Sequence, residues 1–392
     1  MSGSASVPRV VRALGWVSFF TDVASEMIYP LLPGLLASFG AAPVWLGAME
    51  GVAEAVSAGV KWRMGAVADR ARRKKPWIAA GYTLATFSRP LLSLATAGAH
   101  VVVLRTLDRL GKGIRGVPRD ALVAASVPEA QLATAFAFHR AMDNAGSVLG
   151  PIVAFTLLRF LSLDVRTVMA LAVLPGMVSL GVLLFGVREE APVTPAPEEH
   201  HDATRAPAPA LPGAVLRYLV VLAVFTLGAS ADSFLLLRAV DVGLPAAWLP
   251  LVWLGLSGVK AASNLPGGKL ADRLGRRRTV AFGWAAYAAV YACIPFVPGV
   301  GGFVAVVLAY GAYYGLTEGP ERALLVSLAP PEARGRALGA MHAVTGLAVL
   351  PANLLFGVLY GIDPRLAFTT SAGCAGLATV LLLLLVDERR GR

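Results

Sequence analysis

Two basic stretches in different halves of the chain decide the fold. They are Gly65–Lys75, which reads GAVADRARRKK, and Gly268–Arg278, which reads GKLADRLGRRR. The offset of 203 residues between them also aligns other residues: Trp45 with Trp248, Gly116 with Gly319, Arg119 with Arg322, Pro128–Glu129 with Pro331–Glu332, and His139 with His342. A single offset that holds from Trp45 to His139 indicates that one half of the chain duplicates the other.

The composition indicates an integral membrane protein. Of the 392 residues, 56% are hydrophobic and 15% are charged, whereas a soluble domain carries about 25% charged residues. The mean hydropathy of +0.67 agrees. Cys293 and Cys374 lie in apolar runs, which argues against a disulfide framework or a metal site.

The apolar segments predict twelve membrane-spanning helices, because a span needs about 20 mostly apolar residues. In the first half they are 13–37, 43–67, 77–98, 100–118, 132–159 and 165–187. In the second half they are 214–238, 246–270, 279–298, 301–328, 336–360 and 364–386. We therefore expect an all-α protein of two pseudo-symmetric six-helix bundles, 1–187 and 214–392. The segment 188–213 between them is rich in Pro, Ala and charge and predicts a cytoplasmic linker.

The basic residues orient these spans and account for the net charge of +11. With a cytoplasmic N-terminus, the cytoplasmic side holds the runs Arg70–Lys75 and Arg276–Arg278, Arg115, Arg119 and the C-terminal arginines. The opposite side holds Arg159, Arg166, Arg238 and Arg365. This asymmetry follows the positive-inside rule and places both termini in the cytoplasm. The positive charge is therefore a topology signal, and we expect no nucleic-acid partner.

Both basic stretches resemble the loop signature G-x-x-x-D-R-x-G-R-R-[KR] of the major facilitator superfamily (MFS). The second copy fits almost completely, and the first has Arg72 in place of the inner glycine. The resemblance implies two like-oriented bundles that rock around a central site. It also implies that the signature closes the cytoplasmic side in one access state, through Gly65, Asp69, Arg70, Arg73, Gly268, Asp272, Gly275, Arg273 and Arg276.

A second motif resembles the antiporter signature of drug–proton exchangers in this superfamily. It comprises Gly146, Gly150 and Pro151 within the span 132–159, without the trailing glycine pair of that signature. The alternative interpretation is structural, since small residues let helices pack closely and proline kinks them. Both interpretations stay open on the sequence alone.

Ionisable residues inside the spans are the candidate site. Each costs at least about 2.5–3.5 kcal/mol at a helix centre, so it should face a cavity or a partner. For proton coupling we expect Asp22, Glu26, Asp108, Asp143 and Arg105, the last at a position that the family often ties to coupling. For the substrate cavity we expect Tyr29, Glu50, Glu54, Arg89, Arg109, Lys112, His139, Arg140, Asn144, Asp232, Tyr310, Tyr314, Glu318 and Arg322.

Helical spacing places Arg105, Asp108, Arg109, Lys112 and Arg115 on one face, where Asp108 can pair with Arg105 or Lys112. Arg89 stands nearly alone in its span. A carboxyl group loses its proton more readily in water or beside an arginine than when it is buried. Carboxyl groups that are alternately wet and occluded would therefore bind and release protons. The alternative is that such pairs only fix helix packing.

The sequence as a whole predicts a proton-coupled secondary transporter and not an enzyme. We expect export of a small organic compound by a monomer in the bacterial plasma (inner) membrane, with the proton gradient as energy source and no metal or other cofactor. This expectation rests on family resemblance. Four alternatives stay open: a porter for an organic anion or metal chelate, an exporter of lipophilic cations using Asp232 or Glu318, a lipid flippase, and a transporter-like receptor.

Overall fold

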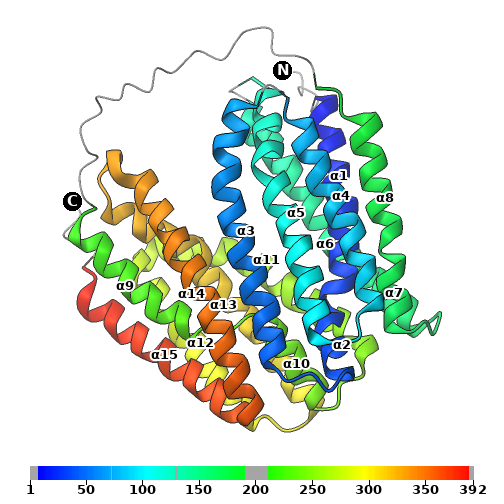
Figure 1. The fold of residues 1–392 in the computed structure, drawn as a ribbon. Helices are drawn as coiled ribbons and strands as arrows, with labels where there is room; N and C mark the ends of the chain where they lie inside the picture. Colours follow the sequence, from blue (N-terminus) through cyan, green and yellow to red (C-terminus); the bar gives the residue numbers. More distant parts are fainter. Residues whose placement is uncertain (1–7, 72, 129–130, 190–210, 388–392) are drawn as a thin grey trace. The chain divides into compact units, whose positions relative to one another are not determined.

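A computed structural model describes residues 8–71, 73–128, 131–189 and 211–387, except the side chains of Ala66, Asp69, Arg70, Ala133 and Glu332. These residues form helices, and no β-strand occurs in the ranges described (Figure 1). The predicted linker 188–213 lies mostly outside them. Seven of the described helical segments are long and apolar enough to cross a membrane. Others, such as α3 (Val44–Arg70) and α5 (Gly98–Ala125), carry several charges within their length.

The helices follow the predicted spans closely. Those of the first half are α1 (Arg9–Ile28), α2 (Leu32–Ser38), α3, α4 (Lys75–Leu91), α5, α6 (Leu132–Arg159), α7 (Val165–Leu171) and α8 (Val173–Gly181). Those of the second half are α9 (Gly213–Gly228), α10 (Ser233–Asp241), α11 (Leu249–Leu274), α12 (Arg276–Cys293), α13 (Gly299–Leu328), α14 (Arg334–Ile362) and α15 (Pro364–Leu385). Short 3-10 or π turns extend several of them.

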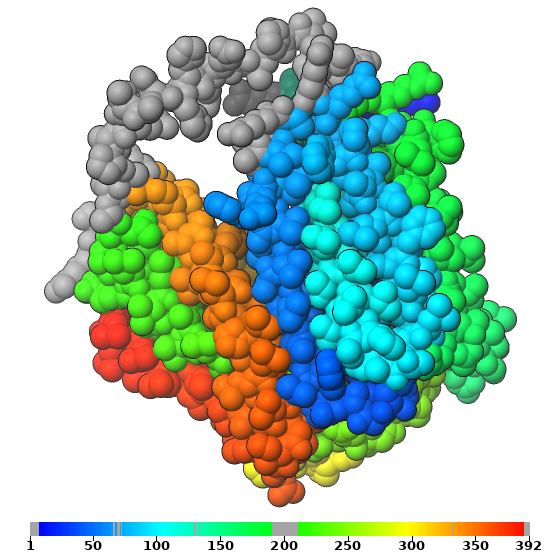
Figure 2. Space-filling view, viewed as in Figure 1, coloured from blue at the N-terminus to red at the C-terminus, as the bar shows by residue number. Residues whose placement is uncertain are grey.

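Contacts divide the chain into two units. The first contains residues 1–41, 52–194 and 245–254, and the second contains 42–51, 195–244 and 255–392. The boundaries therefore differ from the predicted bundles in two short segments, 42–51 and 245–254. In the first unit, α4 and α5 lie side by side and form a continuous part of its surface (Figure 2).

Close backbone contact between α4 and α5 depends on two glycines. A Cβ atom on Gly81 would lie 2.5 Å from the carbonyl oxygen of Gly111, and one on Gly111 would lie 2.6 Å from that of Gly81. Small residues at such crossings let membrane helices approach closely. This crossing sets the distance at which the polar side chains of the two helices meet.

The span predicted as one helix over 214–238 is interrupted, which corrects the sequence interpretation. The backbone turns out of helical geometry at Ala229, and α10 begins at Ser233. The freed backbone N–H of Ala231 donates to Asn353 Oδ1 at 2.8 Å, and that of Ser230 donates to the Tyr287 hydroxyl at 3.3 Å. Such partners allow a broken helix at membrane depth. The break places Asp232 at the start of α10.

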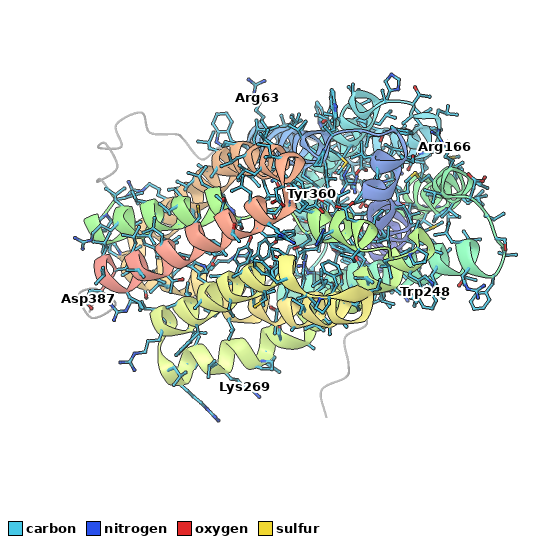
Figure 3. The ribbon with its side chains drawn as sticks, turned by 90° about the horizontal axis from the view of Figure 1, so that it is seen from below. Arg63, Arg166, Trp248, Lys269, Tyr360 and Asp387 are labelled. Atoms are coloured by element: carbon cyan, nitrogen blue, oxygen red, sulfur yellow. The ribbon has the colours of Figure 1, made fainter. Side chains whose placement is uncertain are left out.

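The outer surfaces of the helices are apolar. Phe185, Leu347 and Leu384, for example, are 86%, 79% and 74% exposed. Single charged side chains, such as Arg63 and Lys269, also project outward from the helices (Figure 3). A lipid-facing surface follows from these exposed apolar side chains.

Asp164 precedes α7 at the connection from α6. The Thr167 hydroxyl and backbone N–H donate to the carboxyl group of Asp164 and lower its pKa.

Candidate functional site

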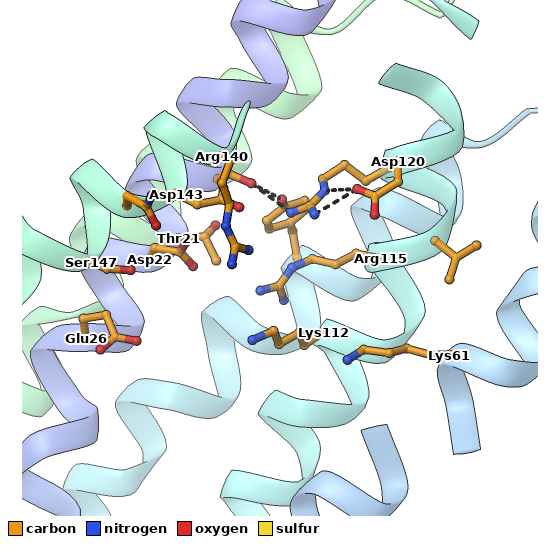
Figure 4. Close-up of a pocket in the computed structure, with 16 residues that line it drawn as sticks. Thr21, Asp22, Glu26, Lys61, Lys112, Arg115, Asp120, Arg140, Asp143 and Ser147 are labelled. Atoms are coloured by element: carbon orange, nitrogen blue, oxygen red, sulfur yellow. Dashed lines mark hydrogen bonds and ion pairs between the residues drawn. The ribbon is translucent and has the colours of Figure 1, made fainter. Parts of the chain in front are cut away.

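Five of the predicted charged residues of the first unit line one cavity of about 500 Å³ (Figure 4). Helices α1, α3, α4, α5 and α6 supply its lining. The predicted residues on it are Asp22, Glu26, Lys112, Arg140, Asp143 and Asn144. Further lining residues are Ser18, Thr21, Lys61, Tyr82, Arg115, Arg119, Asp120 and Ser147. The cavity is therefore polar and charged although it lies among membrane-spanning helices.

The antiporter-like motif packs against the backbone that carries Asp22 and Glu26. A Cβ atom on Gly146 would lie 2.4 Å from the carbonyl oxygen of Phe19 and 3.0 Å from Asp22 Cβ. One on Gly150 would lie 2.8 Å from Glu26 Cβ. Pro151 follows within α6. The two glycines thus bring α6 onto α1 beside both carboxylates, which gives the motif a positional purpose in this chain.

Ser18 is the centre of a hydrogen-bonded network that reaches the cavity. Its hydroxyl lies 3.1 Å from His139 Nε2, and His139 Nδ1 lies 3.5 Å from Asp143 Oδ1. Arg119 Nη1 donates to the same hydroxyl oxygen at 3.0 Å, and the Tyr82 hydroxyl lies 3.3 Å away. The order Ser–His–Asp is that of a hydrolase triad. Here, however, the hydroxyl oxygen also accepts a hydrogen bond from the Arg119 guanidinium, which weakens it as a nucleophile.

Asp108 is the centre of a buried ion network in the same unit. Arg89 Nε donates to Asp108 Oδ1 at 2.8 Å, and Arg105 Nη1 donates to Asp108 Oδ2 at 3.0 Å. Arg89 Nη1 also donates to the backbone oxygen of Thr21 at 2.8 Å. All three charged side chains are at most 4% exposed. Arg89 is therefore not isolated as the sequence suggested, and Asp108 pairs with Arg105 and Arg89 rather than with Lys112.

The remaining predicted residues of the first half have separate positions. Arg109 Nε lies 3.4 Å from Glu54 Oε1, and Glu50 is buried on α3. Tyr29 is buried, with the Arg105 guanidinium 5.0 Å from its ring centre. None of these four predicted side chains lines the 500 Å³ cavity.

The second unit holds a smaller polar cluster around Asp232. The hydroxyl groups of Tyr310 and Tyr314 both donate to Asp232 Oδ1 at 3.0 Å. Lys260 forms an ion pair with Asp232 and lies 3.9 Å above the centre of the Tyr314 ring. Because Asp232 has a cationic partner, it does not form the uncompensated acid that a lipophilic-cation site would require.

Glu318 and Arg322 form an exposed pair with a separation of 3.8 Å on α13. Their neighbour Glu321 accepts a hydrogen bond of 2.7 Å from Trp284 Nε1. The indole ring of Trp284 stacks on Phe225 with the ring centres 4.6 Å apart.

Both basic signatures begin in the last turns of a helix. Residues 65–70 of the first copy belong to α3, which ends at Arg70, and the side chains of Asp69 and Arg70 are outside the described residues. Arg73 is exposed just beyond. In the second copy, Gly268, Asp272 and Arg273 lie in α11, Gly275 has a φ of 90°, and Arg276 begins α12. The glycine that the first copy lacks is thus required by the left-handed turn of the second. Closure of the cytoplasmic side by these residues stays a prediction.

Some functional residues could have been found from the sequence and others not. Lys260 is a charged residue within an apolar span, which is the signal used for the other candidates. The sequence places Arg115 and Arg119 among the basic residues of the cytoplasmic side and does not name them as cavity residues. Helix α5 continues to Ala125, beyond the predicted span end at 118, and both arginines line the cavity. Ser18 and Tyr82 carry no charge, and no sequence signal distinguishes them from packing residues.

Comparisons with known proteins agree with this architecture. The family model described as Major Facilitator Superfamily matches residues 14–259 and 251–392. An MFS-type transporter of Methanocaldococcus jannaschii is 30% identical over 382 residues, which cover 96% of this chain and 94% of that protein. A protein of Mycobacterium tuberculosis is 30% identical over 363 residues, covering 91% and 87%.

Solved structures share the fold at low sequence identity. A nucleoside transporter, NupG, has a TM-score of 0.77 at 12% identity, covering 96% of this chain and 100% of the other. A D-xylose–proton symporter has a TM-score of 0.70 at 15% identity, with 98% of each chain covered.

Proposed function

Because the chain belongs to the major facilitator superfamily, a family of multi-pass membrane transporters, we propose that it is a proton-coupled secondary transporter of a small organic compound. The observation that carries the proposal is the placement of Asp22, Glu26 and Asp143 around one charged cavity among membrane-spanning helices. Carboxylates at such a depth are costly unless water, a partner or a ligand compensates them.

Proton coupling follows from how these carboxylates respond to their surroundings. Burial disfavours the charged form of a carboxyl group, and a nearby cation favours it. Asp22 and Glu26 are the coupling residues in this proposal, because both line the cavity. When access to the cavity alternates, their hydration changes, and protons are bound on one side of the membrane and released on the other. One structure of the same fold is a D-xylose–proton symporter, so the fold supports proton coupling in that protein.

The proposal includes a direction and a location. Gly146, Gly150 and Pro151 resemble an antiporter signature, and the two glycines lie against the α1 backbone beside Asp22 and Glu26. This favours exchange of protons for substrate and hence export. We place the protein as a monomer in the bacterial inner membrane. The positive-inside asymmetry supports cytoplasmic termini. The two six-helix bundles are the parts that rock against each other.

Neutral replacement of the coupling residues tests the proposal. Asp22→Asn and Glu26→Gln should each reduce pH-driven flux in proteoliposomes by about 100-fold or more, since these side chains then no longer ionise. Counterflow, which needs no proton movement, should continue. The substrate is first found by a thermal-shift ligand screen on the purified protein. As a control, Asp164→Asn changes an acid outside the cavity to a residue that still caps a helix. Wild-type pH-driven flux in both cavity variants would show that the coupling assignment is wrong.

A further inference from the structure

The charges around the cavity are separated by sign. The acidic wall consists of Asp22 and Glu26 on α1 and Asp143 on α6. The basic wall consists of Lys61 on α3 and Lys112 and Arg115 on α5. Figure 4 shows Asp22 and Glu26 on one side of the cavity and Lys112 and Lys61 on the other. A cavity with this lining presents opposite potentials to the two ends of a bound molecule.

Pairs within the protein do not remove this separation. Arg119 pairs with Asp120 at 2.9 Å, so these two lining residues compensate each other. Arg140 is a single cation on the acidic side, against the three carboxylates of the acidic wall. Asp143 is already engaged by His139 at 3.5 Å. Asp22 and Glu26 therefore remain as the main acids facing the basic wall.

The residues of the basic wall have few partners. Among the described residues, neither Lys61 nor Lys112 has a carboxylate within 4 Å. Arg115 is 4% exposed and its guanidinium lies 4.5 Å from the centre of the Tyr82 ring. Its Nη1 atom is buried without a hydrogen-bond partner in the part of the chain described. A buried guanidinium N–H without an acceptor is costly, and an anionic group of a ligand would supply one.

We propose that the substrate is a small zwitterion. This rests on the proposed transport function and specifies its substrate class. The carboxylate or phosphonate of the substrate binds Lys112 and Arg115, and its ammonium group binds Asp22 and Glu26. On the acidic wall, Trp253 Nε1 donates to Glu26 Oε2 at 2.7 Å, which leaves the other carboxylate oxygen for the ligand. A cavity of about 500 Å³ is within the usual range for small-molecule sites.

The separation of acidic and basic residues in the cavity also disfavours ligands that carry only one sign of charge. A purely cationic ligand would leave the basic wall without an anion, and a purely anionic ligand would leave Asp22 and Glu26 without a cation. Either mismatch disfavours binding. The ammonium group of the zwitterion and the coupled protons bind the same two carboxylates, Asp22 and Glu26, and therefore exclude each other. Binding of substrate then displaces protons, which is the relation that an exchanger requires.

Matched ligands test this proposal on the purified full-length protein. The probes are a panel of free amino acids and aminoalkylphosphonates, their N-acetyl forms, which are anions, and the amides of the amino acids, which are cations. Binding is measured by calorimetry without any gradient. The best zwitterions should bind at least about tenfold more tightly than both blocked forms of the same skeleton, a difference of about 1.4 kcal/mol. This comparison needs no variant protein and so does not depend on folding of a mutant.

Two variants then assign the two ends of the ligand. Lys112→Met should weaken binding of zwitterions and N-acetyl forms about tenfold and leave the amides unchanged. Asp22→Asn should weaken zwitterions and amides and leave the N-acetyl forms unchanged. Lys269→Met and Asp164→Asn, which alter residues outside the cavity, should have no effect.

Equal or tighter binding of a blocked form, or no binding by any zwitterion of the panel, would overturn the proposal. If pH-driven flux is then found for a compound of another charge class, the proposed transport function still holds. If no compound gives pH-driven flux, the transport function fails even where zwitterions bind.

Discussion

Replacing Asp108 by asparagine is expected to lower the free energy of unfolding by about 3–5 kcal/mol. The carboxylate accepts hydrogen bonds from Arg89 at 2.8 Å and Arg105 at 3.0 Å, and the three side chains are at most 4% exposed. Removing this negative charge takes away the carboxylate that the buried guanidinium groups of Arg89 and Arg105 share. A buried ion pair contributes modestly as a whole, but the loss of one partner is costly.

Denaturant or thermal unfolding of the detergent-purified protein measures this effect. The matched control is Asp120→Asn, which breaks the pair with Arg119 where the Asp120 side chain is 52% exposed. An exposed pair contributes about 1 kcal/mol or less. Equal unfolding temperatures of the two variants would show that the Asp108 network stabilises the protein no more than the exposed Arg119–Asp120 pair does. A second variant that also replaces Arg89 by methionine should recover part of the loss.

Replacing Gly146 by leucine is expected to separate α1 from α6 and to destabilise the protein by about 3 kcal/mol. The first side-chain carbon alone would lie 2.4 Å from the backbone oxygen of Phe19, which cannot move without moving α1. Because Asp22 Cβ is 3.0 Å from the same point, the substitution should also displace Asp22 and reduce pH-driven transport.

Gly373→Leu is the matched control, since Gly373 lies within α15 with no heavy atom near its Cβ position. It should fold and transport like the unmodified protein. Unfolding temperature and proteoliposome flux are measured for both variants. Wild-type stability and flux in Gly146→Leu would mean that the motif is not needed to pack α6 against α1.

Sequence reasoning located the helices well because span length and apolar composition are local properties. It failed where a distant partner decides the local structure. The break after Gly228 contains no proline, and it is accommodated by hydrogen bonds that its backbone N–H groups donate to Asn353 and Tyr287. No local pattern contains that information.

The candidate site was predicted in part for the same reason. Buried charges are conspicuous in an apolar sequence, so Asp22, Glu26 and Lys112 could be named in advance. Their partners could not, because Arg89 and Asp108 meet only where α4 crosses α5 at Gly81 and Gly111. Ser18, with its uncharged hydroxyl, becomes recognisable only when His139 and Arg119 are placed beside it.

The bond between Arg89 and Asp108 has a consequence for how the protein is made. Each of these charges opposes the entry of its own segment into lipid as the chain leaves the ribosome, and α5 adds Arg105, Arg109 and Lys112 to that penalty. Paired across the α4–α5 hairpin, Arg89 and Asp108 compensate each other. We expect the two segments to insert into the bilayer as a pair. Either segment synthesised alone should insert inefficiently.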